Sequence, residues 1–78
     1  MARIETDQTR FRRTMGHSLA IKRRRAGLTL HQLADVAGVG YTTIWSYENG
    51  QTNIPGYMLY KLSCIMDCTM DELAGVER

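Results

Sequence analysis

Three hydroxyl side chains share one side of a short helical pattern in the middle of the chain. Between residues 40 and 48, Ile44 and Tyr47 are spaced to fall on a single helical face, which we predict to be buried. The hydroxyl-bearing residues directed away from that face are Tyr41, Thr42 and Ser46. Because a hydroxyl group both donates and accepts hydrogen bonds, this face is suited to binding a polar partner.

The residue types that most often catalyse reactions or bind metals form no comparable group. His17 and His31 fall on separate predicted helices, and no nucleophile or phosphate-loop motif accompanies them. Cys64 and Cys68 are four residues apart, a spacing too rigid in a helix for an easy disulfide, and no further Cys or nearby His completes a zinc site. We therefore expect no enzymatic activity, no metal and no cofactor, and two reduced thiols that line the core.

The hydroxyl-bearing segment is the second of two short helices joined by a tight turn. Thr29 is a candidate N-cap for a helix over 29–37, and Gln32 completes a capping box three residues later. Gly38 follows the last apolar position, where a helix ends easily in the left-handed conformation. The second helix, 40–48, stops at Asn49-Gly50. The spacing alone predicts a helix-turn-helix.

Residues 27–50, which contain both of these helices, also match a known pattern, GLT-x-x-QLA-x-x-AGV-x-x-x-x-I-x-x-YENG. This pattern resembles the Cro/C1-type (XRE family, phage-repressor-like) helix-turn-helix DNA-binding domain. The resemblance extends back to Leu19 and Arg23 and forward through Pro55, Leu62 and the DEL sequence at 71–73. It implies an all-α, five-helix lambda-repressor-like fold with a central helix-turn-helix, in which helix 40–48 binds the major groove of double-stranded DNA.

Two further segments surround this motif. We predict a flexible N-terminal arm over 1–9, with a short extra turn of helix as the alternative, and a folded domain over 10–78. Arg3 in the arm and Arg10 just after it are candidates for phosphate or minor-groove contact. The first helix of the domain, 10–26, has an apolar stripe opposite a basic face without any acid between 10 and 25. The residues of the stripe are Phe11, Met15, Leu19 and Ala26.

The C-terminal part predicts two more helices. The fourth, 56–66, follows Pro55, and Asp67 stands where a left-handed turn favours Gly. Its expected buried residues are Tyr57 or Met58, then Leu62, Ile65 and Met66. Thr69 and Glu72 give a second capping box for a short fifth helix that ends at about Ala74, with Leu73 in the core.

The length and charge of the chain agree with a small nucleic-acid-binding domain. The 78 residues allow one small core and carry a net charge of +2. Residues 1–61 contribute +5 and residues 62–78 contribute −3. A polyanion on one surface would explain this asymmetry, although two solvated faces that differ by chance remain the alternative. Neither a signal peptide nor an apolar run long enough for a membrane is present in the sequence, which leads us to expect a cytoplasmic protein.

The resemblance implies which residues contact DNA. The base-facing residues are Tyr41, Thr42, Trp45 and Ser46, and the phosphate-contacting residues are Thr29, Leu30, Thr43, Gln51, Thr52 and Asn53. Leu30 departs from the family, which usually has Gln there, so only a backbone contact is expected at this position. Helix 40–48 contains no Arg, Lys, Asn or Gln, so specificity would depend on van der Waals contact and DNA shape. For Trp45, a ring folded back against the domain is the equal alternative.

Three other residues receive roles from the resemblance. Arg23 is expected to form a partly buried ion pair with Glu48, and Met70 is the candidate contact of a homodimer on a palindromic operator. The implied function is that of a small transcriptional regulator, acting as a repressor. The alternative is a protein-binding module, such as an antitoxin or a regulator's partner, which the weakly polar surface of Leu30, Tyr41 and Trp45 favours.

Overall fold

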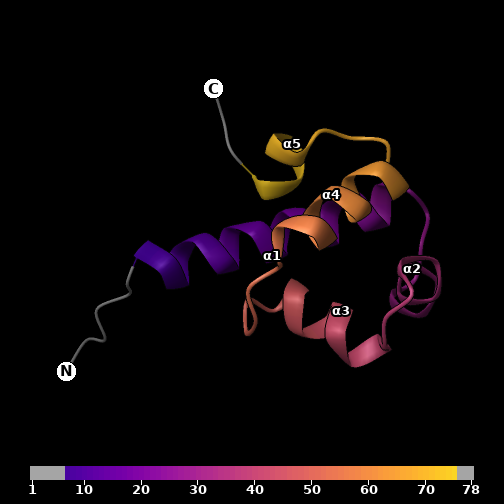
Figure 1. Ribbon diagram of the computed structural model, residues 1–78, viewed down its shortest axis with the longest axis horizontal. Helices are drawn as coiled ribbons and strands as arrows, with labels where there is room; N and C mark the ends of the chain where they lie inside the picture. Colours follow the sequence, from indigo (N-terminus) through magenta and orange to yellow (C-terminus); the bar gives the residue numbers. More distant parts are fainter. Residues whose placement is uncertain (1–6, 76–78) are drawn as a thin grey trace.

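The described part of the chain, residues 7–75 of the computed structural model, contains five helices and no strand. They are α1 (Asp7–Arg25), α2 (Leu30–Ala37), α3 (Tyr41–Glu48), α4 (Gly56–Ile65) and α5 (Met70–Ala74) (Figure 1). The all-α class, the helix count and the central helix-turn-helix formed by α2 and α3 are confirmed. Within this part of the chain, no helix is long and apolar enough to cross a membrane.

Both predicted capping boxes are present and fix where α2 and α5 begin. The Gln32 backbone N–H donates to Thr29 Oγ1 at 3.1 Å, and the Thr29 N–H donates to Gln32 Oε1 at 2.9 Å. Thr69 and Glu72 exchange the equivalent bonds at the start of α5. At the other end of α2, Gly38 adopts a φ of 74°, the left-handed conformation that lets the chain turn sharply into α3.

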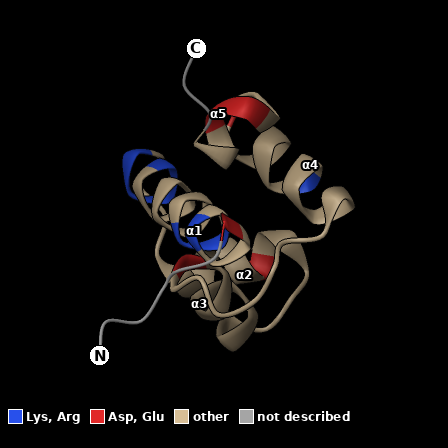
Figure 2. Cartoon of the chain, turned by 90° about the vertical axis from the view of Figure 1, so that its left-hand side faces the viewer, with Lys and Arg blue, Asp and Glu red and all other residues tan. Residues whose placement is uncertain are grey.

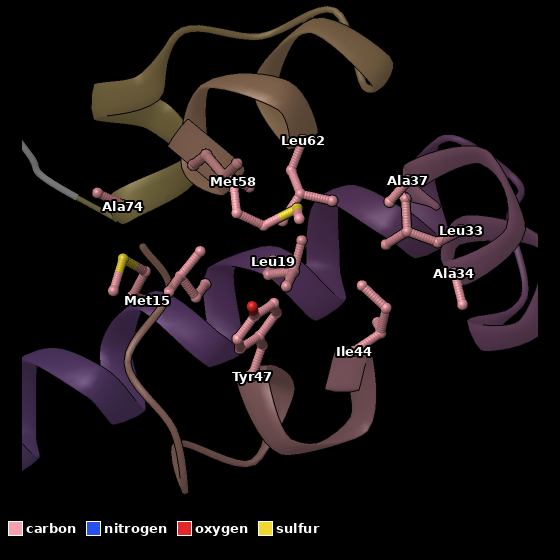
Figure 3. Packing of buried hydrophobic residues seen from close by; sticks show 12 residues of the cluster. Met15, Leu19, Leu33, Ala34, Ala37, Ile44, Tyr47, Met58, Leu62 and Ala74 are labelled. Atoms are coloured by element: carbon pink, nitrogen blue, oxygen red, sulfur yellow. The ribbon is translucent and has the colours of Figure 1, made fainter. Parts of the chain in front are cut away.

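One small core joins the helices, with Leu19 of α1 near its centre (Figure 3). Ile44 and Tyr47 reach it from α3, and Met58 and Leu62 reach it from α4 (Figure 3). The side chains with essentially no exposed surface are Leu19, Leu33, Ile44, Leu62 and Leu73. The predicted inward face of α3 and the core position of Leu73 are therefore confirmed, and the packing fixes which side of α3 faces outward.

The first helix differs from its prediction at both ends. It starts at Asp7 instead of residue 10, so residues 7–9 of the predicted arm are helical, while residues 1–6 lie outside the described residues. Phe11 is 50% exposed because the N-terminal end of α1 extends beyond the other helices (Figure 1). Ala26 follows the end of the helix and is also exposed. Only Met15 and Leu19 of the four-residue stripe are buried.

The α4 region shows which of Tyr57 and Met58 is buried and corrects the prediction that both cysteines line the core. Met58 is buried and Tyr57 is 73% exposed, so Met58 is the core residue at the start of the predicted stripe. Cys64 is exposed rather than core-lining, whereas Cys68 packs against the core. Burial raises the pKa of the Cys68 thiol, which keeps it protonated near neutral pH. Asp67 adopts the expected left-handed conformation, with a φ of 53°.

Acid should weaken the start of α5. The hydrogen bond from the Thr69 backbone N–H, together with the Thr69 side chain, lowers the pKa of Glu72 below its ordinary value of 4.5. A carboxyl group whose pKa is lowered by folding stabilises the folded state above the unfolded pKa, and this contribution is lost as pH falls through the folded pKa. The measurement is the thermal unfolding midpoint, taken from neutral pH down to pH values below 4.5. As the pH falls, the midpoint should decrease less steeply for Glu72→Gln than for the native chain, because the variant has no carboxylate to protonate at this position. Parallel curves would contradict this assignment.

Candidate nucleic-acid interface

The outward face of α3 carries the four predicted base-facing residues, and none of them is buried. Tyr41 is 38% exposed and Trp45 is 40% exposed, Thr42 is exposed and Ser46 is half-buried. The Trp45 ring is therefore accessible at the surface, as a base contact requires. Ile44 and Tyr47 anchor the opposite side of the same two helical turns in the core, so the four residues are presented on a fixed support.

Tyr41 is held by a contact that the sequence did not indicate. Its ring stacks on that of His31 from α2, with ring centroids 4.3 Å apart and planes inclined by 19°. The stack orients the aromatic side chain at the first position of α3 before any partner binds, which lowers the conformational entropy lost on binding.

A shallow hollow joins α3 to the loop that follows it. It has a volume of about 200 Å³ and is lined by Thr42, Thr43, Ser46, Tyr47 and Thr52. The fold thus brings two predicted base-facing residues and two predicted phosphate-contacting residues around one depression. Burial raises the pKa of the Tyr47 phenol above its ordinary value of 10.0.

The N-terminus of α2 offers backbone donors rather than side chains. The first N–H groups of a helix have no intrahelical acceptor, and the capping box uses those of Thr29 and Gln32. Those of Leu30 and His31 remain for an anion at the positive end of the helix. The Leu30 side chain packs against the core and has no hydrogen-bonding group, so only the backbone of this residue can contact a phosphate.

The loop from Asn49 to Pro55 keeps its polar side chains in solvent. Gly50, with a φ of 69°, reverses the chain after α3, and the Gln51 N–H donates back to the Ser46 carbonyl at 3.0 Å. The backbone donor of Gln51 is therefore already used, and only its side chain is available to a phosphate. The exposed side chains of this loop include the three predicted ones, Gln51, Thr52 and Asn53.

The expected ion pair ties α1 to the end of α3. Arg23 Nε lies 2.6 Å from Glu48 Oε2, and Arg23 Nη2 donates to Glu48 Oε1 at 3.1 Å. Arg23 Nη1 also donates to the Leu28 carbonyl at 2.9 Å. The side chains are only 11% and 8% exposed, so the pair is structural and unavailable to DNA. It fixes the C-terminal end of α3 relative to α1 and the corner before α2.

A second contact between α1 and α3 depends on a residue without a side chain. A Cβ atom placed on Gly16 would lie 2.3 Å from the Tyr47 carbonyl oxygen and 2.7 Å from that of Glu48. The two backbones thus approach too closely for any larger residue at this crossing. A lone Gly inside a helical pattern gives no sign of what it packs against, so the sequence did not reveal this role.

The charged residues are distributed unevenly around this surface. Lys and Arg gather along α1, whereas α2 and α3 carry none and α5 is acidic (Figure 2).

Within residues 7–75, no group of three or more His, Cys, Asp or Glu side chains is placed to hold a metal ion. Met70, at the start of α5, is 37% exposed and thus accessible to a second copy of the chain.

Comparison with protein families decides the identity of this arrangement. The helix-turn-helix family matches residues 19–73, which include the whole of α2, α3 and α4. The chain belongs to the Cro/C1-type, XRE helix-turn-helix family. This membership supports the function of a DNA-binding transcription regulator.

Solved structures of helix-turn-helix regulators have the same fold. The restriction-modification controller protein C.AhdI from Aeromonas hydrophila is 28% identical with a TM-score of 0.74, over 78% of this chain and 92% of that one. The clp gene regulator ClgR from C. glutamicum is 23% identical with a TM-score of 0.75, over 83% and 88%. A hypothetical transcription factor, NHTF, from Neisseria is 18% identical with a TM-score of 0.78, over 95% and 85%. No curated protein sequence matches the chain.

Proposed function

We propose that this helix-turn-helix protein binds a specific double-stranded DNA operator and represses transcription. The observation that carries the proposal is the exposed face of α3, on which Tyr41, Thr42 and Ser46 project from a helix anchored by Ile44 and Tyr47. An α-helix of this size fits the major groove. A protein seated there excludes other proteins from the same DNA, which is the simplest way for a small domain to repress.

The phosphate contacts flank the base-facing residues on two sides. The N–H groups of Leu30 and His31 at the start of α2 bind one phosphate strand, and the hydroxyl group of Thr29, whose own N–H is used by the capping box, donates to the same strand. On the other side of α3, the contacts come from Thr43 and from the exposed loop residues Gln51, Thr52 and Asn53. These neutral donors fix the register of the protein on the duplex without reading its sequence.

Specificity rests on shape and apolar contact. The hydroxyl groups of Thr42 and Ser46 distinguish bases less strictly than a bidentate Gln or Arg would. The rings of Tyr41 and Trp45 and the methyl group of Thr42 pack on thymine methyl groups. Sequence-dependent width and bending of the operator supply the remaining discrimination.

A palindromic operator would require the protein to bind DNA as a homodimer. Two half-sites one helical turn apart are read by two copies related by a two-fold axis. We assign the dimer contact to Met70, which is 37% exposed at the start of α5.

Met70→Glu should weaken this assembly. Two carboxylates brought together at a two-fold contact repel, so binding to a two-half-site operator should lose its cooperativity while binding to a single half-site is retained. Tyr57→Glu places the same charge on a side chain that is 73% exposed and serves as the matched control. Equal losses in both variants, in anisotropy titrations with one-half-site and two-half-site duplexes, would remove Met70 from the interface.

A protein-binding module is the second candidate, favoured by the exposed apolar residues around the helix-turn-helix. Val36 of α2 is 58% exposed, and Trp45 of α3 is 40% exposed. A titration of the protein on DNA from upstream of its own gene, at two salt concentrations, separates the two functions. DNA binding predicts that log K falls with log salt by about 0.9 for each phosphate neutralised. Absence of binding at low salt would favour the protein partner.

A further inference from the structure

We propose that α1 carries an additional site for the DNA backbone, formed by Arg10, Arg13 and His17 where α1 passes the end of α3. The site would take a phosphate group of the duplex, outside the part that α3 reads. It deepens the proposed function and rests on it, since it assumes that DNA lies against α3.

The site is an open pocket between two elements. It has a volume of about 560 Å³. The residues that line it are Arg10, Arg13, Thr14, His17, Glu48 and Asn49. The four α1 residues are spaced i, i+3, i+4 and i+7, so they share one face of the helix, and all four are exposed. Two arginines and a histidine, together with Thr14 and Asn49, therefore line one pocket.

The charge of the pocket is positive despite the presence of Glu48. Both carboxylate oxygens of Glu48 are engaged by Arg23, at 2.6 and 3.1 Å, so the negative charge is already compensated from the protein side. No acidic residue occurs in α1 after Asp7. The guanidinium group of Arg matches a phosphate with two parallel hydrogen bonds. The pocket thus has the positive charge and the kind of donor group that a phosphate requires.

The position of the pocket links it to the DNA-binding surface. Asn49 lines the pocket and also begins the loop that presents Gln51, Thr52 and Asn53. At the same point a Cβ atom on Gly50 would lie 3.0 Å from the Arg13 Cα, so the loop and α1 are in direct contact. Phosphate strands border the major groove, so a strand that contacts this loop would also come near α1. The basic residues of α1 thereby extend the phosphate-binding surface beyond α2 and α3, which carry no Lys or Arg.

Arg10→Gln tests this site against Arg24→Gln, a matched variant that removes the same charge from an exposed position at the other end of α1. On duplexes of selected and of random sequence alike, Arg10→Gln should lower affinity and reduce the slope of log K against log salt by about 0.9, the value for one phosphate. Arg24→Gln should leave the slope unchanged. Equal slopes for both variants and the native protein would overturn the inference and leave the proposed function intact.

A second measurement uses the DNA. The flanks of a selected duplex are shortened one base pair at a time until the native protein loses affinity. The double variant Arg10→Gln/His17→Gln already lacks the contact with the flanking phosphate. Shortening the flank should therefore not lower its affinity further. The same loss in the double variant would contradict the site. Competition by millimolar inorganic phosphate alone, without an effect of flank length, would identify a free-anion site instead. Native protein that binds no duplex at all would refute the proposed function on which the inference rests.

Discussion

Gly16→Ala is expected to lower the free energy of unfolding by about 3 kcal/mol or more, the upper range for overpacking a tight interior. The added methyl group would lie 2.3 Å from the Tyr47 carbonyl oxygen and 2.7 Å from that of Glu48. Both obstacles are backbone atoms of α3, so no side chain can rotate out of the way. Relief requires α1 and α3 to separate, which opens the core around Leu19. Urea unfolding followed by circular dichroism measures the loss.

Gly56→Ala is the matched control. A Cβ atom at Gly56, the first residue of α4, would meet no atom within 4 Å. Replacing Gly by Ala in a helix stabilises by roughly 0.5–1 kcal/mol when the site is unstrained, and less at the first position of a helix. If Gly16→Ala were as stable as Gly56→Ala, the close approach of α1 and α3 would be wrong, and with it the placement of the base-facing surface.

Glu48→Ala is the second variant with a large expected effect, a loss of about 3–5 kcal/mol, as found when one partner of a buried ion pair is removed. The guanidinium group of Arg23 would keep its bond to the Leu28 carbonyl but lose both carboxylate contacts in a site where the side chain is 11% exposed. A charge left unpaired in such a site is poorly hydrated. Thermal and denaturant unfolding of the variant give the change directly.

Two further variants test whether the loss of stability comes from the unpaired, buried charge of Arg23 or from the removal of any ion pair. Arg23→Met combined with Glu48→Leu removes both charges and should recover most of the stability lost in Glu48→Ala. Lys22→Met breaks the longer pair between Lys22 Nζ and Glu72 Oε2, at 3.9 Å, where the Glu72 side chain is 54% exposed. An exposed pair of this kind contributes about 0–1 kcal/mol. A loss in Lys22→Met as large as that in Glu48→Ala would show that burial is not the cause.

The parts of the fold that the sequence predicted are those encoded locally. A capping box is complete within four residues, so Thr29 with Gln32 and Thr69 with Glu72 could be identified without any tertiary information. The spacing of Ile44 and Tyr47 likewise determined the inward face of α3. The ion pair of Arg23 and Glu48 spans 25 positions and came from the family resemblance, because no local rule links such distant residues.

The parts that were missed depend on how the helices pack. Phe11 fits the apolar spacing of α1 but lies beyond the reach of the other helices, so periodicity alone overextended the stripe. The stack of His31 on Tyr41 and the close approach at Gly16 arise between elements and leave no trace in either segment alone. The basic pocket of α1 was visible only in part, as a run of Arg residues whose neighbours in space were unknown.

The central claim is that Tyr41, Thr42 and Ser46 read the operator, and simultaneous replacement of all three by alanine tests it most directly. The measurement is the ratio of affinities for a duplex selected from a random pool and for an unselected duplex, at one salt concentration. Loss of base contacts should reduce this ratio by at least tenfold, about 1.4 kcal/mol, while affinity for unselected DNA and the salt slope stay close to native. A triple variant that discriminates as well as the native protein would contradict the account.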